Sequence, residues 1–213
     1  GQALVTDGNG VFSFAAAGAS ELNDLSDAVT NSSGETLGVG TGALANDDGS
    51  NRENTALGYN ALNATTEGNQ NVAVGGEALN TNTIGGRNTA VGYQALYTVN
   101  HFNCTAVGCK ALYANTGQSN TAVGHEALTS NTSAIGGVAF GREALRSNTT
   151  GQDNSACGMD ALKNNTTGSH SAAVGRNALR NATTGGQNIA IGYQAGDNIT
   201  TGSNVTVIGY NAD

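Results

Sequence analysis

The stretch Asn88–Leu96 reads Asn-Thr-Ala-Val-Gly-Tyr-Gln-Ala-Leu, and it decides the fold because it returns along most of the chain. Nearly the same nine residues occur at Asn54–Leu62 and at Asn120–Leu128. Aligning the copies on the central glycine gives eleven glycines at intervals of 16 to 18 residues: Gly40, Gly58, Gly75, Gly92, Gly108, Gly124, Gly141, Gly158, Gly175, Gly192 and Gly209. So regular a period is typical of a solenoid, in which stacked repeats bury a continuous core.

The length and residue pattern of the repeat predict which kind of solenoid forms. A period of 17 residues is too short for two helices, whose repeats take about 33 residues or more. The Thr-Ala-Val step suits a strand, and stretches such as Asn148–Gly151 (Asn-Thr-Thr-Gly) supply turn residues. Residues 36–213 are therefore predicted to form an all-β, parallel β-solenoid of about eleven rungs, with two short strands per rung.

Alternation along the Thr-Ala-Val strand puts valine and threonine on one face and alanine on the other. We expect the valine face to fill the coil together with the leucine that follows the repeat glycine by four residues. The alanine face would then be flat and exposed, so that another copy of the chain could approach it in a cyclic homo-oligomer. The alternative is that alanine merely fits a tight turn or a narrow coil. The expected facet consists of Ala56, Ala73, Ala90, Ala106, Ala122, Ala139, Ala156, Ala173 and Ala190.

The repeat also carries a family resemblance. Its phrase Asn-Thr-Ala-Val-Gly-x-x-Ala-Leu resembles the head repeat of trimeric autotransporter adhesins, the YadA-like left-handed parallel β-roll, and Asn71–Gly75 and Asn188–Gly192 match that repeat closely. The longer wording with Tyr-Gln-Ala-Leu resembles repeats in bacteriophage tail fibres, including those of cyanophages. The resemblance covers about five sixths of the chain. It implies left-handed coils, a parallel homotrimer and an extracellular or virion location.

Residues 1–35 lack the period and are predicted to form an N-terminal connector or cap. Gly1–Phe14 reads as two short strands around Asp-Gly and Asn-Gly turns. Ser20–Val29 reads as a helical turn, since its apolar residues recur at helical spacing. The segment is similar to connectors in phage tail-fibre proteins, and it would cover the open strand edge of the first rung.

Composition excludes several classes of function. The net charge of −8 would repel the phosphate backbone of a nucleic acid, so we expect no nucleic-acid binding. No run of about 18 apolar residues occurs, so we expect no membrane insertion, and no signal peptide is recognisable at the start. Cys104, Cys109 and Cys157 form no Cys-x-x-Cys pair, and no catalytic motif is present. We therefore expect no enzyme, no metal site and no cofactor, and we expect the acidic loop Ala45–Glu53 to be solvated rather than to bind Ca²⁺.

Aromatic exceptions to the repeat are the candidate ligand-binding residues. Tyr97, His101, Phe102 and Tyr113 gather around two repeats that are shortened to 16 residues. Aromatic faces beside asparagines suit the apolar C–H faces and hydroxyls of sugars, so these four residues form the predicted saccharide site. The alternative is that Phe102 turns inward to fill the shortened turn.

The sequence thus predicts a non-enzymatic segment of a phage tail fibre in the virion. It would be a rigid trimeric rod, joined to other fibre proteins, that binds a glycan or protein receptor on the host surface or spaces the receptor-binding tip. The alternative is the head of a trimeric adhesin on a bacterial cell surface. A soluble ice- or carbohydrate-binding solenoid is a third possibility, but ice binding needs an unbroken threonine face. The threonine column is interrupted at Val72, Val138, Ser155, Ala172 and Ile189.

Overall fold

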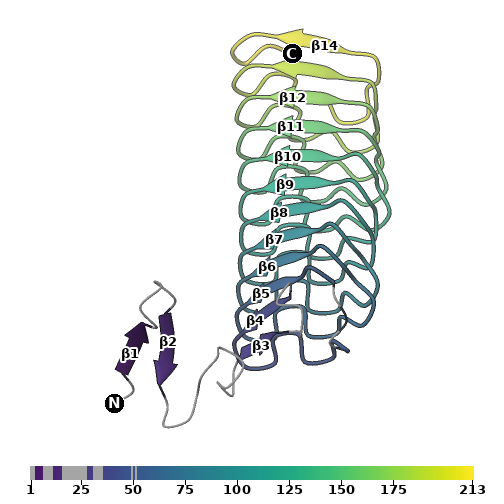
Figure 1. The fold of residues 1–213 in the computed structure, drawn as a ribbon. Helices are drawn as coiled ribbons and strands as arrows, with labels where there is room; N and C mark the ends of the chain where they lie inside the picture. Colours follow the sequence, from purple (N-terminus) through teal and green to yellow (C-terminus); the bar gives the residue numbers. More distant parts are fainter. Residues whose placement is uncertain (1–2, 7–11, 16–27, 31–35, 49, 51) are drawn as a thin grey trace.

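The computed structural model describes residues 3–6, 12–15, 28–30, 36–48, 50 and 52–213, which contain fourteen strands and no helix (Figure 1). The strands are β1 (Ala3–Thr6), β2 (Phe12–Ala15), β3 (Ala28–Thr30), β4 (Leu37–Val39), β5 (Thr55–Leu57), β6 (Val72–Val74), β7 (Thr89–Val91), β8 (Thr105–Val107), β9 (Thr121–Val123), β10 (Val138–Phe140), β11 (Ser155–Cys157), β12 (Ala172–Val174), β13 (Ile189–Ile191) and β14 (Thr206–Ile208).

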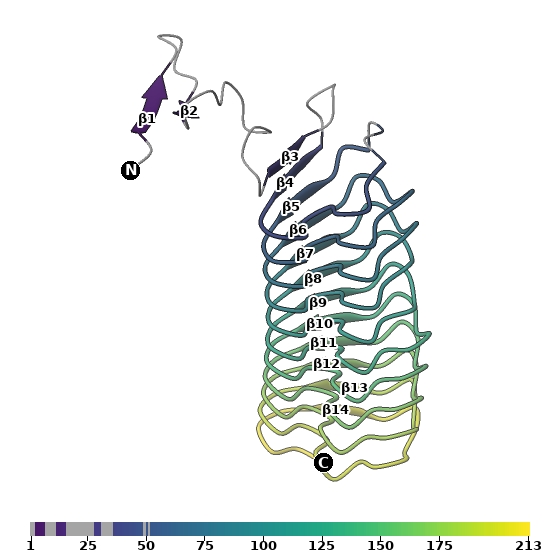
Figure 2. The ribbon, with the colours of Figure 1, turned by 90° about the horizontal axis from the view of Figure 1, so that it is seen from below.

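Strands β4 to β14 form one parallel sheet in chain order, and each strand pairs with the next without a shift in register. Ala90 of β7 lies opposite Ala106 of β8, which lies opposite Ala122 of β9. Each step along the chain therefore adds one rung to the end of the stack, and Figure 2 shows the loops of the rungs stacked beside the sheet. The predicted parallel β-solenoid with a period of about 17 residues is confirmed.

Each rung holds one strand of three residues rather than the two that the sequence predicts. The opposite wall consists of turns, because the leucine after the repeat glycine adopts a left-handed backbone, as at Leu96 with φ 50°. That conformation is uncommon for a residue with a side chain and breaks an extended strand. The walls are still joined between rungs, since the Leu62 N–H donates to the Ala78 carbonyl at 3.0 Å.

The core of the coil consists of alanines from the strands and leucines from the opposite wall, and this corrects the predicted orientation of the strand. The nine alanines expected at an exposed trimer-axis facet, Ala56, Ala73, Ala90, Ala106, Ala122, Ala139, Ala156, Ala173 and Ala190, are 0–1% exposed in the single chain. The leucines are buried as predicted, whereas Val91 is 36% exposed and points outward.

The thickness of the coil explains why alanine faces inward. Gly38 occupies the alanine position in the first rung, and a Cβ added there would lie 3.1 Å from Leu44 Cδ1. A methyl group therefore already fills the gap between the two walls, and a valine would overpack it. The alternative that alanine fits a narrow coil is the one that the structure bears out.

Two repeated polar features hold the rungs at a fixed spacing. Asn120 is fully buried; its Nδ2 donates to the Ala134 carbonyl at 2.8 Å, and its Oδ1 accepts from the Gly137 N–H of the next rung at 2.8 Å. Asn54, Asn71, Asn88, Asn154 and Asn188 repeat the interaction with the next rung. The repeat glycines pack against one another, and a Cβ at Gly92 (φ 131°) would lie 2.7 Å from the Gly108 carbonyl oxygen.

The N-terminal end of the sheet is closed by β3, which pairs antiparallel with β4. This strand lies within the predicted connector and supplies the hydrogen-bonding partner that the edge of β4 would otherwise lack. β1 and β2 pair antiparallel where the sequence predicts a hairpin, with Ala3 opposite Ala15. The predicted helical turn over Ser20–Val29 lies outside the described residues except at its last two positions, which belong to β3.

Candidate functional site

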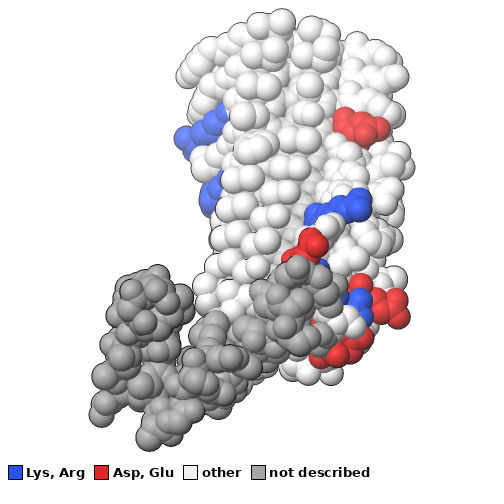
Figure 3. Space-filling model, viewed as in Figure 1, with Lys and Arg blue, Asp and Glu red and all other residues white. Residues whose placement is uncertain are grey.

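The outward side chains of β4 to β14 form a continuous surface, which we call the outer sheet face. Figure 3 shows no charge on the part of this face that it exposes, with the charged side chains lying along its edges. Large apolar side chains on it are exposed, among them Leu57 at 49% and Phe140 at 46%. Its two columns are Leu37, Thr55, Val72, Thr89, Thr105, Thr121, Val138, Ser155, Ala172, Ile189 and Thr206, and Val39, Leu57, Val74, Val91, Val107, Val123, Phe140, Cys157, Val174, Ile191 and Ile208.

An exposed apolar surface of this length is the signature of an interaction site rather than of a solvated wall. Eleven strands at about 4.8 Å each make it roughly 50 Å long. Sequence reasoning identified both columns but assigned the valines to the interior, so it missed this surface.

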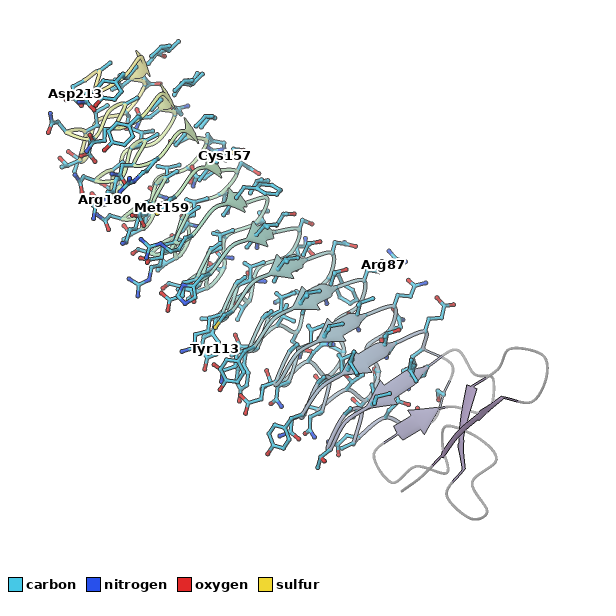
Figure 4. All side chains as sticks on the ribbon, turned by 90° about the vertical axis from the view of Figure 1, so that its left-hand side faces the viewer. Arg87, Tyr113, Cys157, Met159, Arg180 and Asp213 are labelled. Carbon is cyan, nitrogen blue, oxygen red and sulfur yellow. The ribbon has the colours of Figure 1, made fainter. Side chains whose placement is uncertain are left out.

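The predicted saccharide residues separate into two places. Tyr97 and Tyr113 stack with their ring centroids 5.2 Å apart and their planes at 17°, and Lys110 Nζ lies 5.9 Å from the Tyr113 centroid. Figure 4 shows Tyr113 along one long edge of the rod and Arg87 along the other. The loop of Phe102 belongs to the Arg87 edge, because the Asn103 N–H donates to the Gly86 carbonyl, at 3.2 Å, directly beside Arg87.

The loop that carries His101 and Phe102 replaces a repeat turn. The His101 carbonyl accepts from Asn88 Nδ2 at 2.8 Å, so the main chain keeps the contact that glycine carbonyls make in other rungs. Phe102 remains 42% exposed, and a Cβ at Gly86 would lie 3.4 Å from Phe102 Cδ1. The phenyl ring thus lies on the surface of the neighbouring loop rather than turning inward. The structure brings together the two tyrosines but not all four predicted residues.

Cys104 is a second feature of the shortened repeat. It occupies a buried asparagine position, and its N–H donates to Asn88 Oδ1 at 2.9 Å. Burial raises the pKa of its thiol, so the neutral form is favoured. The side chain therefore fills space in the core rather than acting as a nucleophile.

A ladder of ion pairs runs along the Tyr113 edge and was also missed. Arg146 Nε lies 2.8 Å from Glu126 Oε2, and Lys163 Nζ lies 2.7 Å from Glu143 Oε2. The hydrogen bond from Lys163 is the main cause that lowers the pKa of Glu143, and the charges of Lys163, Arg142 and Arg146 add to it. These charged residues stand one, two or five positions after the repeat glycine. Aligning the repeats could therefore have revealed the ladder.

The acidic loop after β4 contains an ion pair between its own side chains. Arg52 Nη2 lies 2.9 Å from Asp48 Oδ2, and the Ser50 N–H donates to Asp48 Oδ1 at 2.9 Å. The hydrogen bonds from Ser50 and then Arg52 lower the pKa of Asp48 to about 2. A shallow polar hollow beside this loop is lined by Arg52, Glu53, Asn69, Gln70 and Arg87. Over the described ranges, no group of three or more His, Cys, Asp or Glu side chains could hold a metal ion.

The fold defines the chain as a parallel β-solenoid repeat protein. No family model, no curated protein and no solved structure matches it. No helix able to cross a membrane occurs in the part of the chain that the structure describes.

Proposed function

We propose that the chain is a non-enzymatic segment of a phage tail fibre, a rigid homotrimeric rod that attaches the virion to its host or spaces the receptor-binding tip. The observation that carries the proposal is the outer sheet face, an uncharged surface with exposed apolar side chains along the length of the solenoid. A fibre segment has a use for such a face, because identical copies can cover one another along their whole length. The resemblance of the repeat to phage and adhesin β-rolls supports the same reading.

In this trimer the outer sheet faces, rather than the alanines, meet around the common axis. Residues at equal heights face their own copies when the rotation closes. The columns then bring threonines and valines together in repeated layers, and water leaves the exposed side chains of Leu57, Phe140, Ile191 and their neighbours.

Light scattering at micromolar concentration tests the assembly, and we expect three times the 21.2 kDa of the chain. The double variant Val107→Lys and Val123→Lys places charges in the middle of the outer sheet face and should give monomers. Gln118→Lys with Thr150→Lys adds the same charge at exposed loop positions and should leave the trimer intact. A wild-type monomer, or equal disruption by both pairs, contradicts the proposed trimer.

We place the host-surface contact of the rod at the Tyr97–Tyr113 stack, as a weak saccharide site that is repeated in each copy. The aromatic pair and the neighbouring Lys110 offer ring surface and a hydrogen-bond donor. Repetition on one rigid rod raises the avidity of weak contacts by about 10²–10⁴. An array of neutral glycans should lose its signal with Tyr97→Ala and Tyr113→Ala and keep it with Phe102→Ala, which alters the other edge. Loss with Phe102→Ala alone moves the contact there.

A further inference from the structure

The solenoid contains a carboxylate site of its own in the rung of β10. Glu143 Oε1 lies 2.9 Å from Arg142 Nη1, while Glu143 Oε2 lies 2.7 Å from Lys163 Nζ and 3.9 Å from Arg146 Nε. The two arginines stand one and five positions after the repeat glycine, and they flank the carboxylate, which stands two positions after it. The geometry shows how a carboxylate is held at this edge of the rod.

The rung of β12 repeats the two arginines but lacks the acid. Arg176, Asn177 and Arg180 occupy the positions of Arg142, Glu143 and Arg146. The register is continuous between them, since the Asp160 N–H donates to the Arg142 carbonyl at 3.0 Å and the Asn177 N–H to the Met159 carbonyl at 2.9 Å. An amide thus replaces the carboxylate, with an arginine on each side.

The polar groups of this rung are left without the partners that they have in the rung of β10. Neither Arg176 nor Arg180 forms an ion pair with any of the described residues. Arg180 Nε and Asn177 Oδ1 are buried and make no hydrogen bond within the described chain. Such groups cost free energy unless something else satisfies them.

The acids on the adjoining rungs are already engaged. Asp160 lies 3.4 Å from Lys163 Nζ and 3.8 Å from Arg142 Nη2. Asp197 accepts from Asn181 Nδ2 at 3.2 Å. The two arginines therefore have no ion-pair partner among the described residues, on a chain whose net charge is −8.

We propose that Arg176 and Arg180 bind the carboxylate of an acidic saccharide, a uronic-acid oligomer, above Asn177. The carboxylate takes the place that Glu143 occupies beside Arg142 and Arg146, without the contact to Lys163, because Asp197 stands at that position of the next rung. Asn177 Oδ1 and Arg180 Nε lie beneath the surface, so the ligand meets the outer nitrogens of the two guanidinium groups. Figure 4 shows Arg180 along the same long edge as Met159 and Tyr113, so the site is open to a chain lying along the rod.

Aromatic rings continue the site in the direction of the C-terminus. The Arg176 guanidinium lies 5.9 Å from the centroid of Tyr193, which stacks on Tyr210 with centroids 5.2 Å apart. Tyr193 is 36% exposed along the edge of the rod. Sugar rings beyond the bound carboxylate can pack their C–H faces there, which favours a saccharide over a small anion. This site is separate from the Tyr97–Tyr113 stack and does not depend on trimer formation.

Calorimetry with tetragalacturonate tests the proposal, with its fully methyl-esterified form and acetate as comparison ligands. We expect one tetragalacturonate per chain and at least tenfold weaker binding of the other two. Arg176→Gln with Arg180→Gln should weaken binding at least tenfold, whereas Arg52→Gln with Arg87→Gln, which removes the same charge at the other edge, should change it less than twofold. Equal binding of acetate, or a greater loss with the Arg52 and Arg87 pair, overturns the proposal.

Two further variants use the repeat itself as the control. Asn177→Glu supplies an internal carboxylate between the arginines and should abolish binding while the thermal midpoint stays the same or rises. Glu143→Gln vacates the internal site and should raise the stoichiometry from one to two. Unchanged binding by Asn177→Glu, or a stoichiometry that stays at one in a folded Glu143→Gln protein, overturns the proposal. Light scattering on the same samples reports trimer formation separately, so failure of this site is distinguishable from failure of the proposed fibre function.

Discussion

The two faces of the same three-residue strands behave in opposite ways. Inward positions hold alanine in nine of eleven strands and are almost fully buried, whereas outward positions hold mostly larger residues, chiefly threonine and valine, and are half-buried or exposed. Within the strands the larger residues thus lie outside and the smallest lie inside, and the large residues of the core are the leucines of the opposite wall. In this solenoid the distance between the two walls decides which residues fit inside the coil. The hydrophobicity of the outward residues decides only which surfaces can bind to the outer sheet face.

Replacing an inward alanine by a charge should give the largest loss of stability. Ala122→Glu buries a carboxylate without a partner and overpacks a gap that fits one methyl group, and it should cost about 4–8 kcal/mol. Its neighbour Val123 points outward, so Val123→Glu should leave the free energy of unfolding of the single chain within about 1 kcal/mol. Urea unfolding at a concentration that keeps both variants monomeric measures the difference; equal losses would refute the assignment of the faces.

Truncation of a core leucine should give the second-largest loss of stability. Leu145→Ala removes a fully buried side chain and should cost about 2–5 kcal/mol in thermal unfolding. Leu57→Ala removes the same atoms from the outer sheet face, where the side chain is 49% exposed, and should cost less than about 1 kcal/mol in the monomer. In a trimer the Leu57→Ala loss should grow, so its dependence on protein concentration sharpens the comparison.

A buried asparagine should contribute less than a core leucine. Asn120→Ala leaves the Ala134 carbonyl and the Gly137 N–H without the partners they have at 2.8 Å, and it should cost about 2 kcal/mol. Gln118→Ala, at an exposed position two residues earlier, is the matched control and should cost less than about 0.5 kcal/mol. Faster amide hydrogen exchange at Gly137 in Asn120→Ala alone would locate the loss, and uniform exchange in both variants would argue against it.

The charged edge should give the smallest effect, and this effect depends on pH. The pKa of Glu143 is lowered from 4.5 by Lys163 and then by the neighbouring charges, so its ionised form favours the folded state. Its contribution is fully present above pH 4.5 and is lost as the pH falls through the lower folded value. Glu143→Gln should therefore be slightly less stable than wild type at pH 7, and the difference should disappear once the pH lies below the folded pKa of Glu143. A gap that widens in acid would show that the carboxyl group disfavours folding.

The period predicted the fold, the strands and their register, because the repeat glycines and the Thr-Ala-Val steps recur at a nearly fixed interval. The side of the strand that faces inward could not be predicted, because alternation defines two faces but not the width of the gap behind them. Gly38 reveals the width of this gap only through its distance from Leu44, which the structure supplies and the sequence does not. Likewise, the opposite wall was expected to be a strand, since nothing in the sequence reveals that its leucines adopt positive φ.

The candidate sites were predicted with less success for a related reason. Tyr97 and Phe102 are close in sequence but lie in different loop columns, so clustering along the chain overstated their proximity. Arg142, Glu143 and Arg146 were visible as an aligned set, but their pairing with Lys163 needs contacts between rungs. Residues one period apart are neighbours in this fold, and comparison between repeats identifies sites better than comparison within one repeat.

The direction of the hydrogen bonds determines how the rod responds to force. The strands lie across the long axis, so the bonds between them point along it, and a pull on the two ends loads every junction between rungs in series. Such a chain of links is as strong as its weakest junction. The rung that carries Val99 and Cys104 in place of buried asparagines is still bonded to its neighbour through Asn88 and Asn100, so the main-chain bonds common to every junction set its strength. A sideways load instead stretches the junctions on one side of the rod and compresses those on the other.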